Sequence, residues 1–215
     1  MRKRGRMAAL TAVAARQAIH SRRLSWLDEG DDCGLFDEFN AEHPAAAAAV
    51  DSVMGWCEDV YRGKIRGLCL MGNTGCGKTH LGNAACGVLE ADGRVGSYFY
   101  APANWVFEWV RQGYGNGKPV SIKLWLDTWP LIMLDDVGAE HVSEKGQGWS
   151  HAIYLEIAEA LCAKPFVLTT NLGVEQLRER VGGRAWSRFG EAIGANGFVD
   201  MFDLPDYRLA RASRR

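Results

Sequence analysis

The residues with the clearest chemistry lie in the segment GNTGCGKT, residues 72–79. This segment fits the pattern G-x-x-x-x-G-K-[ST] of a phosphate-binding loop, and it has an apolar run before it and a helix-like segment after it. Glycines let such a loop turn its backbone N–H groups toward phosphate oxygens, and the N-terminus of the following helix adds positive potential. The expected nucleotide contacts are the loop residues and the residue after them: Gly72, Asn73, Thr74, Gly75, Cys76, Gly77, Lys78, Thr79 and His80.

Two residues of this loop have distinct expected roles. The Lys78 ammonium would reach the β- and γ-phosphates of a nucleoside triphosphate, and the Thr79 hydroxyl would ligate Mg²⁺. A glycine-rich turn that fits the pattern by accident is the alternative, and the strand–loop–helix context argues against it. The sequence therefore predicts binding of ATP with Mg²⁺.

Two acids follow the apolar run at residues 131–134 and form the expected second half of the site. Ligands of an open parallel sheet collect at the carboxyl ends of the strands, so acids directly after a buried strand face the phosphate loop. Asp135 would hold Mg²⁺, and Asp136 would orient or deprotonate the attacking water. The alternative is that both acids only cap the turn into Gly138.

Further polar groups follow in the C-terminal third of the chain. Asn171 ends the next apolar run, so its amide would lie on the same edge and could hold the attacking water or the γ-phosphate. Arg184 and Arg188 are four residues apart and therefore share a helix face. A planar guanidinium suits the transition state of phosphoryl transfer. A turn-forming asparagine and a solvated basic helix are the alternatives.

The elements that must position these residues alternate between helix and strand. Apolar spacing predicts helices at residues 45–63, 80–90, 103–113, 149–163, 174–180 and 184–193. Apolar and β-branched runs predict strands at residues 68–71, 95–100, 131–136, 165–171 and 197–203. Strands separated by helices indicate an α/β fold, with a parallel sheet covered by helices on both faces.

Composition limits the class of protein. A chain of 215 residues can form one well-buried α/β domain with an appendage. The six cysteines include no C-x-x-C pair, which is typical of a reducing cytosol. The basic, alanine-rich start imitates a signal peptide, but its apolar run is weak and is closed by Arg16. No run reaches the ~20 apolar residues of a membrane span, so we predict a cytoplasmic protein without a membrane partner.

Charge is uneven along the chain, although its formal net value is only -1. Residues 1–26 contain seven arginines and lysines and no acid, whereas residues 28–38 contain six acids and no base. Residues 7–24 predict a helix with a basic face, followed by an acidic linker. We therefore expect a short N-terminal helical extension, residues 1–34, and a nucleotide-binding domain, residues 35–215.

Taken in order, the motifs GNTGCGKTHL, LIMLDDVGAE, TTNL, RAWSRF and DYR resemble those of the AAA+ ATPases in the DnaC-type helicase-loader group. This group is related to the IstB transposition helpers and to the DnaA initiators. The resemblance covers residues 35–208 and includes the lead-in GLFDEFN. It implies a P-loop AAA+ domain with a five-stranded parallel sheet in the order 5-1-4-3-2. It also implies a spiral or ring-shaped homo-oligomer with ATP sites at subunit interfaces.

The resemblance also implies roles for single residues. Asp136 would be the catalytic acid, Asn171 the sensor-1 residue, and Arg188 an arginine finger inserted into a neighbouring subunit's site. Arg184 would be its companion, and Arg208 the sensor-2 arginine that reads the γ-phosphate in its own subunit. The chain departs from its relatives in two ways: residues 163–165 lack an arginine that they often carry, and the N-terminal extension is shorter than a full helicase-binding domain.

Aromatic residues supply a further signal. In relatives, the segment that contains Trp105, Trp109, Trp125 and Trp129 lies near the path of single-stranded DNA. Stacking of bases on these rings, beside Arg111, Lys118 and Lys123, would suit sequence-tolerant binding of single strands. For any one ring, a place in the core or in a subunit interface is the favoured alternative.

Together these features predict a slow ATPase, stimulated by oligomerisation or DNA, that binds single-stranded DNA and delivers or remodels a replicative helicase. The helicase is expected to contact the N-terminal extension, and the small size favours a phage or another mobile element as the source. Two alternatives are an IstB-like transposition helper and a P-loop small-molecule kinase. A binding protein with negligible turnover is a third, because Asp136 is shorter than the glutamate of most AAA+ enzymes.

Overall fold

The computed structural model describes residue 36 and residues 39–64, 67–91, 93, 95–115, 121–140 and 146–212. The helix expected at residues 7–24, the acidic linker and the domain boundary at residue 34 lie outside the described residues. Lys118 lies outside them as well. Within the described part of the chain, no helix is both long and apolar enough to cross a bilayer.

Five parallel strands form one sheet, in the order β2-β3-β4-β1-β5. Parallel pairing joins β1 to β4 and β5, and β3 to β2 and β4. The expected order 5-1-4-3-2 is this order read from the other edge, so the predicted topology is confirmed. The strands are β1 (Gly67–Met71), β2 (Tyr98–Pro102), β3 (Leu131–Asp135), β4 (Phe166–Thr170) and β5 (Phe198–Asp200).

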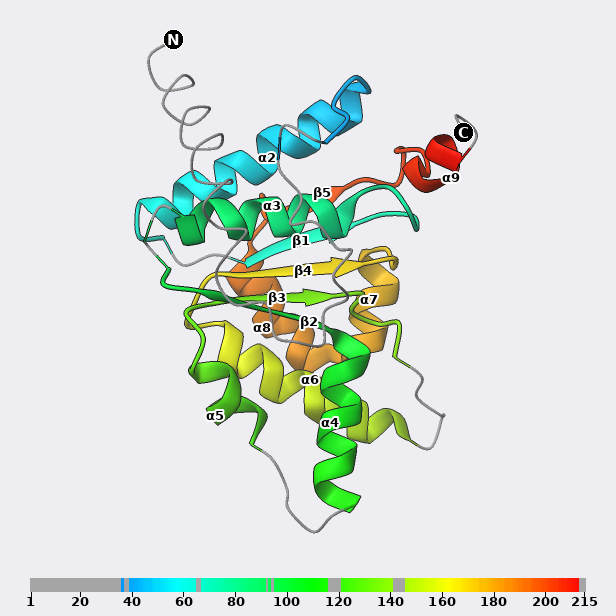
Figure 1. Ribbon diagram of the computed structural model, residues 1–215. Helices are drawn as coiled ribbons and strands as arrows, with labels where there is room; N and C mark the ends of the chain where they lie inside the picture. The colour runs from blue at the N-terminus through cyan, green and yellow to red at the C-terminus, as the bar shows by residue number, and fades with distance from the viewer. Residues whose placement is uncertain are drawn as a thin grey trace.

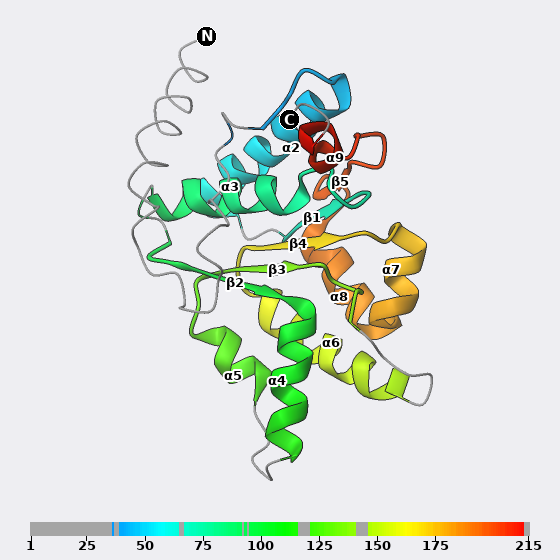
Figure 2. The same cartoon turned by 45° about the vertical axis from the view of Figure 1, so that its right-hand side comes forward.

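Helices cover both faces of the sheet, as expected (Figure 1). Two of them, α2 (Pro44–Tyr61) and α3 (Lys78–Ala91), pack on one face. The other face carries α4 (Ala103–Gly115), α5 (Ile122–Asp127), α6 (Gln147–Leu161), α7 (Val174–Val181) and α8 (Gly183–Ile193). The short helix α9 (Tyr207–Ala212) follows β5, and the turned view shows the same layers (Figure 2).

Each central strand contributes to two cores, because successive side chains of a strand point to opposite faces. In β1, Leu68 and Leu70 pack in the core under α2 and α3, whereas Cys69 and Met71 pack in the core under the helices of the other face. Every residue of β1, β3 and β4 is buried. This double burial explains why these strands read as continuous apolar runs in the sequence.

Most predicted elements are found within a few residues of their expected bounds, and β2 is the main exception. It was expected at residues 95–100, with Pro102 opening the next helix, but it spans Tyr98–Pro102. Proline is tolerated there because Pro102 is the last residue of β2, and β2 is an edge strand of the sheet. The helix α4 begins directly after it, at Ala103.

Candidate nucleotide-binding site

The loop of residues 72–77 joins β1 to α3, and β1 lies between β4 and β5 in the sheet. Gly75 and Gly77 have φ angles of 79° and 95°, in the left-handed region that favours glycine. A Cβ at Gly77 would also lie 2.6 Å from Cε2 of Phe39. The loop therefore has the curled backbone that its sequence predicts, and Phe39 leaves no room for a side chain at Gly77.

Lys78 is buried inside this loop, with 5% of its surface exposed. Its Nζ donates hydrogen bonds of 2.8 Å to the carbonyl oxygens of Gly72 and Asn73 and to Oδ1 of Asn171. A buried ammonium is stable only when its donors are satisfied, and these acceptors satisfy them. The contact with Asn171 joins the phosphate loop to the end of β4.

Thr79 and Asp135 lie together at the start of α3 and the end of β3. The Thr79 hydroxyl donates to Oδ1 of Asp135 at 2.9 Å. Two further hydroxyls donate to the same carboxylate, Tyr100 at 2.9 Å and Thr169 at 2.5 Å. Hydroxyl and carboxylate oxygens are the ligands that Mg²⁺ prefers, so Thr79 and Asp135 fit a magnesium site that a bound nucleotide would complete.

The sequence interpretation did not single out Tyr100 or Thr169 as partners of Asp135. The only signal is their position in β2 and β4, the strands on either side of β3: Thr169 lies near the carboxyl end of β4, and Tyr100 lies in the middle of β2. Asp135 itself is buried, and this burial raises the pKa of its carboxyl above the ordinary value. The neighbouring charge of Asp136 raises the pKa as well, while the hydroxyl donors lower it.

This shift predicts a pH-dependent difference between the wild type and Asp135→Asn in the absence of Mg²⁺. Because the folded-state pKa is raised, the folded chain binds more protons than the unfolded chain between the two pKa values. The wild type should lose stability as pH rises through the folded pKa, and the variant should lack this component. Urea unfolding of both proteins between about pH 4 and pH 7 measures the difference. A pH-independent difference in unfolding free energy would contradict the prediction.

Asp136 and Asn171 complete a chain of hydrogen bonds across the edge of the sheet. Nδ2 of Asn171 lies 3.3 Å from Oδ1 of Asp136, while Oδ1 of Asn171 accepts from Lys78. The Asp136 side chain is exposed, unlike that of Asp135. An exposed carboxylate held beside an amide and a phosphate loop can orient a water for attack on a phosphoryl group. The structure therefore brings together three predicted site residues, Lys78, Asp136 and Asn171, which follow three different strands.

The C-terminal segment crosses the phosphate loop. The Tyr207 N–H donates to the carbonyl oxygen of Gly75 at 3.0 Å, and the Tyr207 ring lies 6.2 Å from the ring of Phe39. The carboxylate of Asp206 also lies against Gly75. Arg208 follows directly and is exposed, so the chain brings it next to the loop of its own subunit.

The structure does not bring Arg188 to this site. Its guanidinium Nη2 lies 3.4 Å from Oε1 of Glu159, and its carbonyl oxygen accepts from Cys162 at 3.4 Å. Both partners lie where α6 ends and the chain approaches the start of β4, whereas the phosphate site lies at the opposite, carboxyl ends of the strands. A five-residue strand spans roughly 17 Å. Arg184 is exposed one turn earlier on the same helix.

Three of the four tryptophans expected near DNA, Trp105, Trp109 and Trp125, pack against one another. Trp105 stacks on Trp109 with ring centroids 6.3 Å apart, and Trp125 lies 4.7 Å from Trp109. Trp125 and Trp129 also contact Phe99, which is buried. Each of the four rings is partly buried against the core. This arrangement favours the core role that was the alternative for each single ring.

The basic residues beside these rings are also engaged within the chain. Arg111 forms an ion pair with Glu108 at 2.7 Å and lies over the Trp149 ring, and Lys123 pairs with Asp127 at 2.6 Å. Lys164, in the segment that lacks the arginine often found in relatives, donates to the carbonyl oxygens of Leu126 and Trp129, at the end of α5 and just after it. The surface of α4 and α5 is therefore not a simple basic stripe.

The strand order, the phosphate loop and the acids after β3 define a P-loop AAA+ fold. No protein-family model matches the sequence, and no curated protein matches it. Solved structures do match. The crystal structure of the DnaC helicase loader aligns with a TM-score of 0.61 and 18% identity, over 74% of this chain and 92% of that one.

Two structures of DnaA initiators match as well. Domain III of DnaA from Thermotoga maritima aligns with a TM-score of 0.60 and 18% identity, over 81% of this chain and 69% of that one. The initiator DnaA bound to AMPPCP and single-stranded DNA aligns with a TM-score of 0.53 and 22% identity, over 70% of this chain and 44% of that one. The resemblance to DnaC-type loaders is thus confirmed at the level of the fold.

Proposed function

We propose that this chain is a cytoplasmic AAA+ ATPase that acts as a homo-oligomer on single-stranded DNA and delivers or remodels a replicative helicase. The observation that carries the ATPase activity is the chain of hydrogen bonds from Lys78 through Asn171 to Asp136. It joins a phosphate loop to an exposed carboxylate. Such a pairing is what attack of water on a terminal phosphate requires.

In this proposal the residues at the loop hold ATP with Mg²⁺. Residues 72–80 bind the phosphates, and Thr79 and Asp135 hold the metal ion, whose charge neutralises the phosphate oxygens. Asp136 orients the attacking water, and Asn171 keeps Asp136 and Lys78 in register. Arg208, which follows the Tyr207 contact with the loop, reads the γ-phosphate in its own subunit.

A second copy of the chain completes the site. Arg188 lies near the start of β4, at the far end of the sheet from its own phosphate loop, and this distance supports a role at another subunit's nucleotide. Interfaces that join a site to a different surface of the next copy generate rings or helical assemblies. This geometry supports the proposal of a spiral or ring of subunits, with Arg188 as the finger and Arg184 beside it.

The proposed partners are inferred from the fold and from the distribution of charge along the chain. The same fold occurs in a helicase loader and in an initiator bound to single-stranded DNA. The basic run within residues 1–34 is not needed for nucleotide chemistry, so we assign helicase contact to this extension and ATP hydrolysis to residues 35–215. Affinity capture with the ATP-analogue-bound chain as bait should retain a replicative helicase, and a transposase in its place would favour an IstB-type role.

The oligomer and its nucleotide dependence can be tested directly. We expect the mass in solution to be that of a monomer alone and to increase with a non-hydrolysable ATP analogue, Mg²⁺ and a single-stranded oligonucleotide. The ATPase rate per chain should rise with protein concentration, because each site needs a neighbour's arginine. A monomer whose rate per chain does not depend on concentration or DNA would contradict the proposal and would favour a stand-alone enzyme such as a small-molecule kinase.

A further inference from the structure

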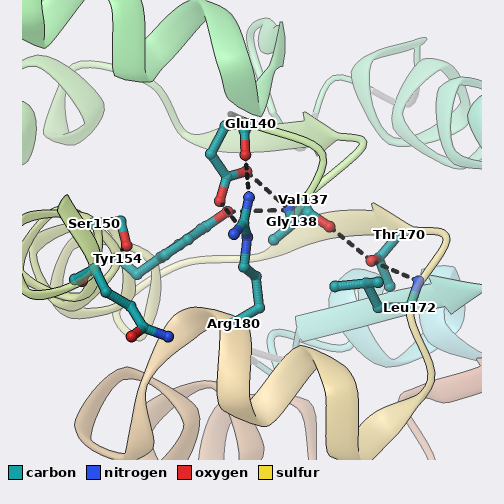
Figure 3. A network of polar contacts seen from close by, with 9 residues as sticks. Val137, Gly138, Glu140, Ser150, Tyr154, Thr170, Leu172 and Arg180 are labelled. Carbon is teal, nitrogen blue, oxygen red and sulfur yellow. Dashed lines mark hydrogen bonds and ion pairs between the residues drawn. The ribbon is translucent and has the colours of Figure 1, made fainter. Parts of the chain in front are cut away.

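A buried ion pair lies beside the candidate site, outside the residues to which phosphate contacts are assigned. Glu140 is only 3% exposed, and its Oε1 accepts from Nε of Arg180 at 3.1 Å. Nη2 of Arg180 donates to the carbonyl oxygen of Glu140 as well, so the guanidinium holds this residue by side chain and backbone (Figure 3). Because removing charges from water is costly, the presence of a buried ion pair is only weak evidence that the pair stabilises the fold.

The pair is tied to the turn that follows β3. The Gly138 N–H lies 3.0 Å from Oε2 of Glu140 and 3.0 Å from the hydroxyl of Tyr154 (Figure 3). Burial, the charge of Glu140 and a hydrogen bond with Glu140 hold the pKa of the Tyr154 phenol well above its usual value, so the phenol stays neutral. Two side chains, from the turn itself and from α6, thus meet at one backbone N–H, and Arg180 of α7 holds the first of them.

This turn carries Asp136 in a strained conformation. The φ angle of Asp136 is 52°, in a region that residues other than glycine rarely adopt. On one side, Thr169 Oγ1 accepts from the Asp136 N–H at 2.9 Å, and the Thr170 hydroxyl donates to the Val137 carbonyl at 2.7 Å. Such strain persists only where the surroundings over-determine the backbone. Glu140, Arg180 and Tyr154 supply that restraint on the other side, through Gly138.

The same ion pair is joined to the helix that carries Arg188. Arg180 lies two residues before Gly182, the single residue between α7 and α8. Leu172 and the stem of Arg180 lie so close to Gly138 that a Cβ at Gly138 would contact both. Gly182 in turn lies against the ring of His151 on α6. The turn after β3 and the start of α8 are therefore packed as one block.

We propose that Glu140, Arg180 and Tyr154 are positioning residues that fix Asp136 toward the subunit's own nucleotide and join it to the helix presenting Arg188 to the next subunit. This inference rests on the proposed ATPase function. Its consequence is that a change at one subunit's γ-phosphate, sensed at Asp136, is transmitted through Arg180 to the arginine that the same subunit offers its neighbour.

The test compares the double variant Glu140→Gln/Arg180→Met with Arg178→Met, whose arginine lies on the same helix with 59% of its side chain exposed. The double variant removes both charges, so it leaves no buried charge unpaired. We expect it to fold and to keep the wild-type affinity for an ATP analogue, while kcat falls about 10- to 100-fold, because a misplaced reacting group costs rate more than binding. Arg180→Lys keeps the positive charge but loses the planar guanidinium with its several N–H donors, so it should give an intermediate kcat.

A purely structural role would have a different signature: lowered Tm with kcat per folded chain equal to that of Arg178→Met. That result would overturn the inference. Arg188→Ala, measured in the same series, separates the two proposals. If Arg188→Ala loses turnover and the double variant does not, the positioning role fails alone. If neither loses turnover, the proposal that a second subunit completes each ATP site fails, and the positioning role fails with it.

Discussion

Lys78→Ala should lower the affinity for ATP about 100-fold or more and abolish measurable hydrolysis. The Lys78 ammonium is buried in the phosphate loop, where a nucleotide's β- and γ-phosphates would accept its hydrogen bonds. Hydrogen bonds between charged groups contribute about 1.5–3 kcal/mol each, so the loss of two corresponds to at least two decades in affinity. Equilibrium binding of a fluorescent ATP analogue, with Mg²⁺ present, measures this change.

The matched control is Lys123→Ala. Lys123 is 55% exposed on α5 and pairs with Asp127, away from the loop, so its removal should leave ATP binding unchanged. Thermal unfolding of both variants without nucleotide shows whether the loop itself survives the loss of the Lys78 contacts to Gly72 and Asn73. A folded Lys78→Ala protein that binds ATP as tightly as the wild type would exclude a phosphate-binding role for this loop.

The second large effect is expected for Arg188→Ala, which should reduce kcat about 10³-fold while ATP binding is kept. An arginine finger acts on the charge that develops in the transition state, and Arg188 lies away from its own chain's loop. The ion pair with Glu159 is exposed on both sides, so its loss should cost at most about 1 kcal/mol of stability. Single-turnover hydrolysis and analogue binding, measured on the same preparation, separate the two effects.

Arg62→Ala is the control for this change. The Arg62 side chain is 49% exposed and pairs with Glu58 at 2.9 Å, so it matches Arg188 in exposure and in having a glutamate partner. It lies at the end of α2, on the other face of the sheet. If both arginine variants hydrolyse ATP at the wild-type rate, Arg188 does not act as a finger.

The elements around the phosphates could be predicted because their chemistry restricts the sequence. A loop that cradles phosphate needs Gly75 and Gly77 where φ is positive, and acids that face it must follow a strand buried on both sides. Asp135, Asp136 and Asn171 were therefore expected on one edge and are found there. The roles given to them, and to Arg184, Arg188 and Arg208, are proposals that the variants above would test.

Other features left no local signal in the sequence. The Glu140–Arg180 pair joins residues 40 positions apart. Glu140 ends the motif LIMLDDVGAE, but the sequence interpretation gave no role to either residue and had no signal that pairs them. Trp105 and Trp125 could be assigned to DNA or to the core from sequence alone, because an aromatic ring suits both surroundings. Only the packing of these rings on Phe99 favours the core. In β2, the edge position that permits Pro102 depends on the sheet order.

The central claim is that each ATP site is completed by a second copy of the chain, and mixing two inactive variants tests it most directly. Lys78→Ala subunits cannot bind ATP but still offer Arg188, whereas Arg188→Ala subunits bind ATP but offer no finger. In an equal mixture with random assembly, about one quarter of the interfaces join an intact loop to an intact arginine, so roughly a quarter of the wild-type ATPase rate should return. A mixture no more active than the average of the two variants alone would contradict the composite site.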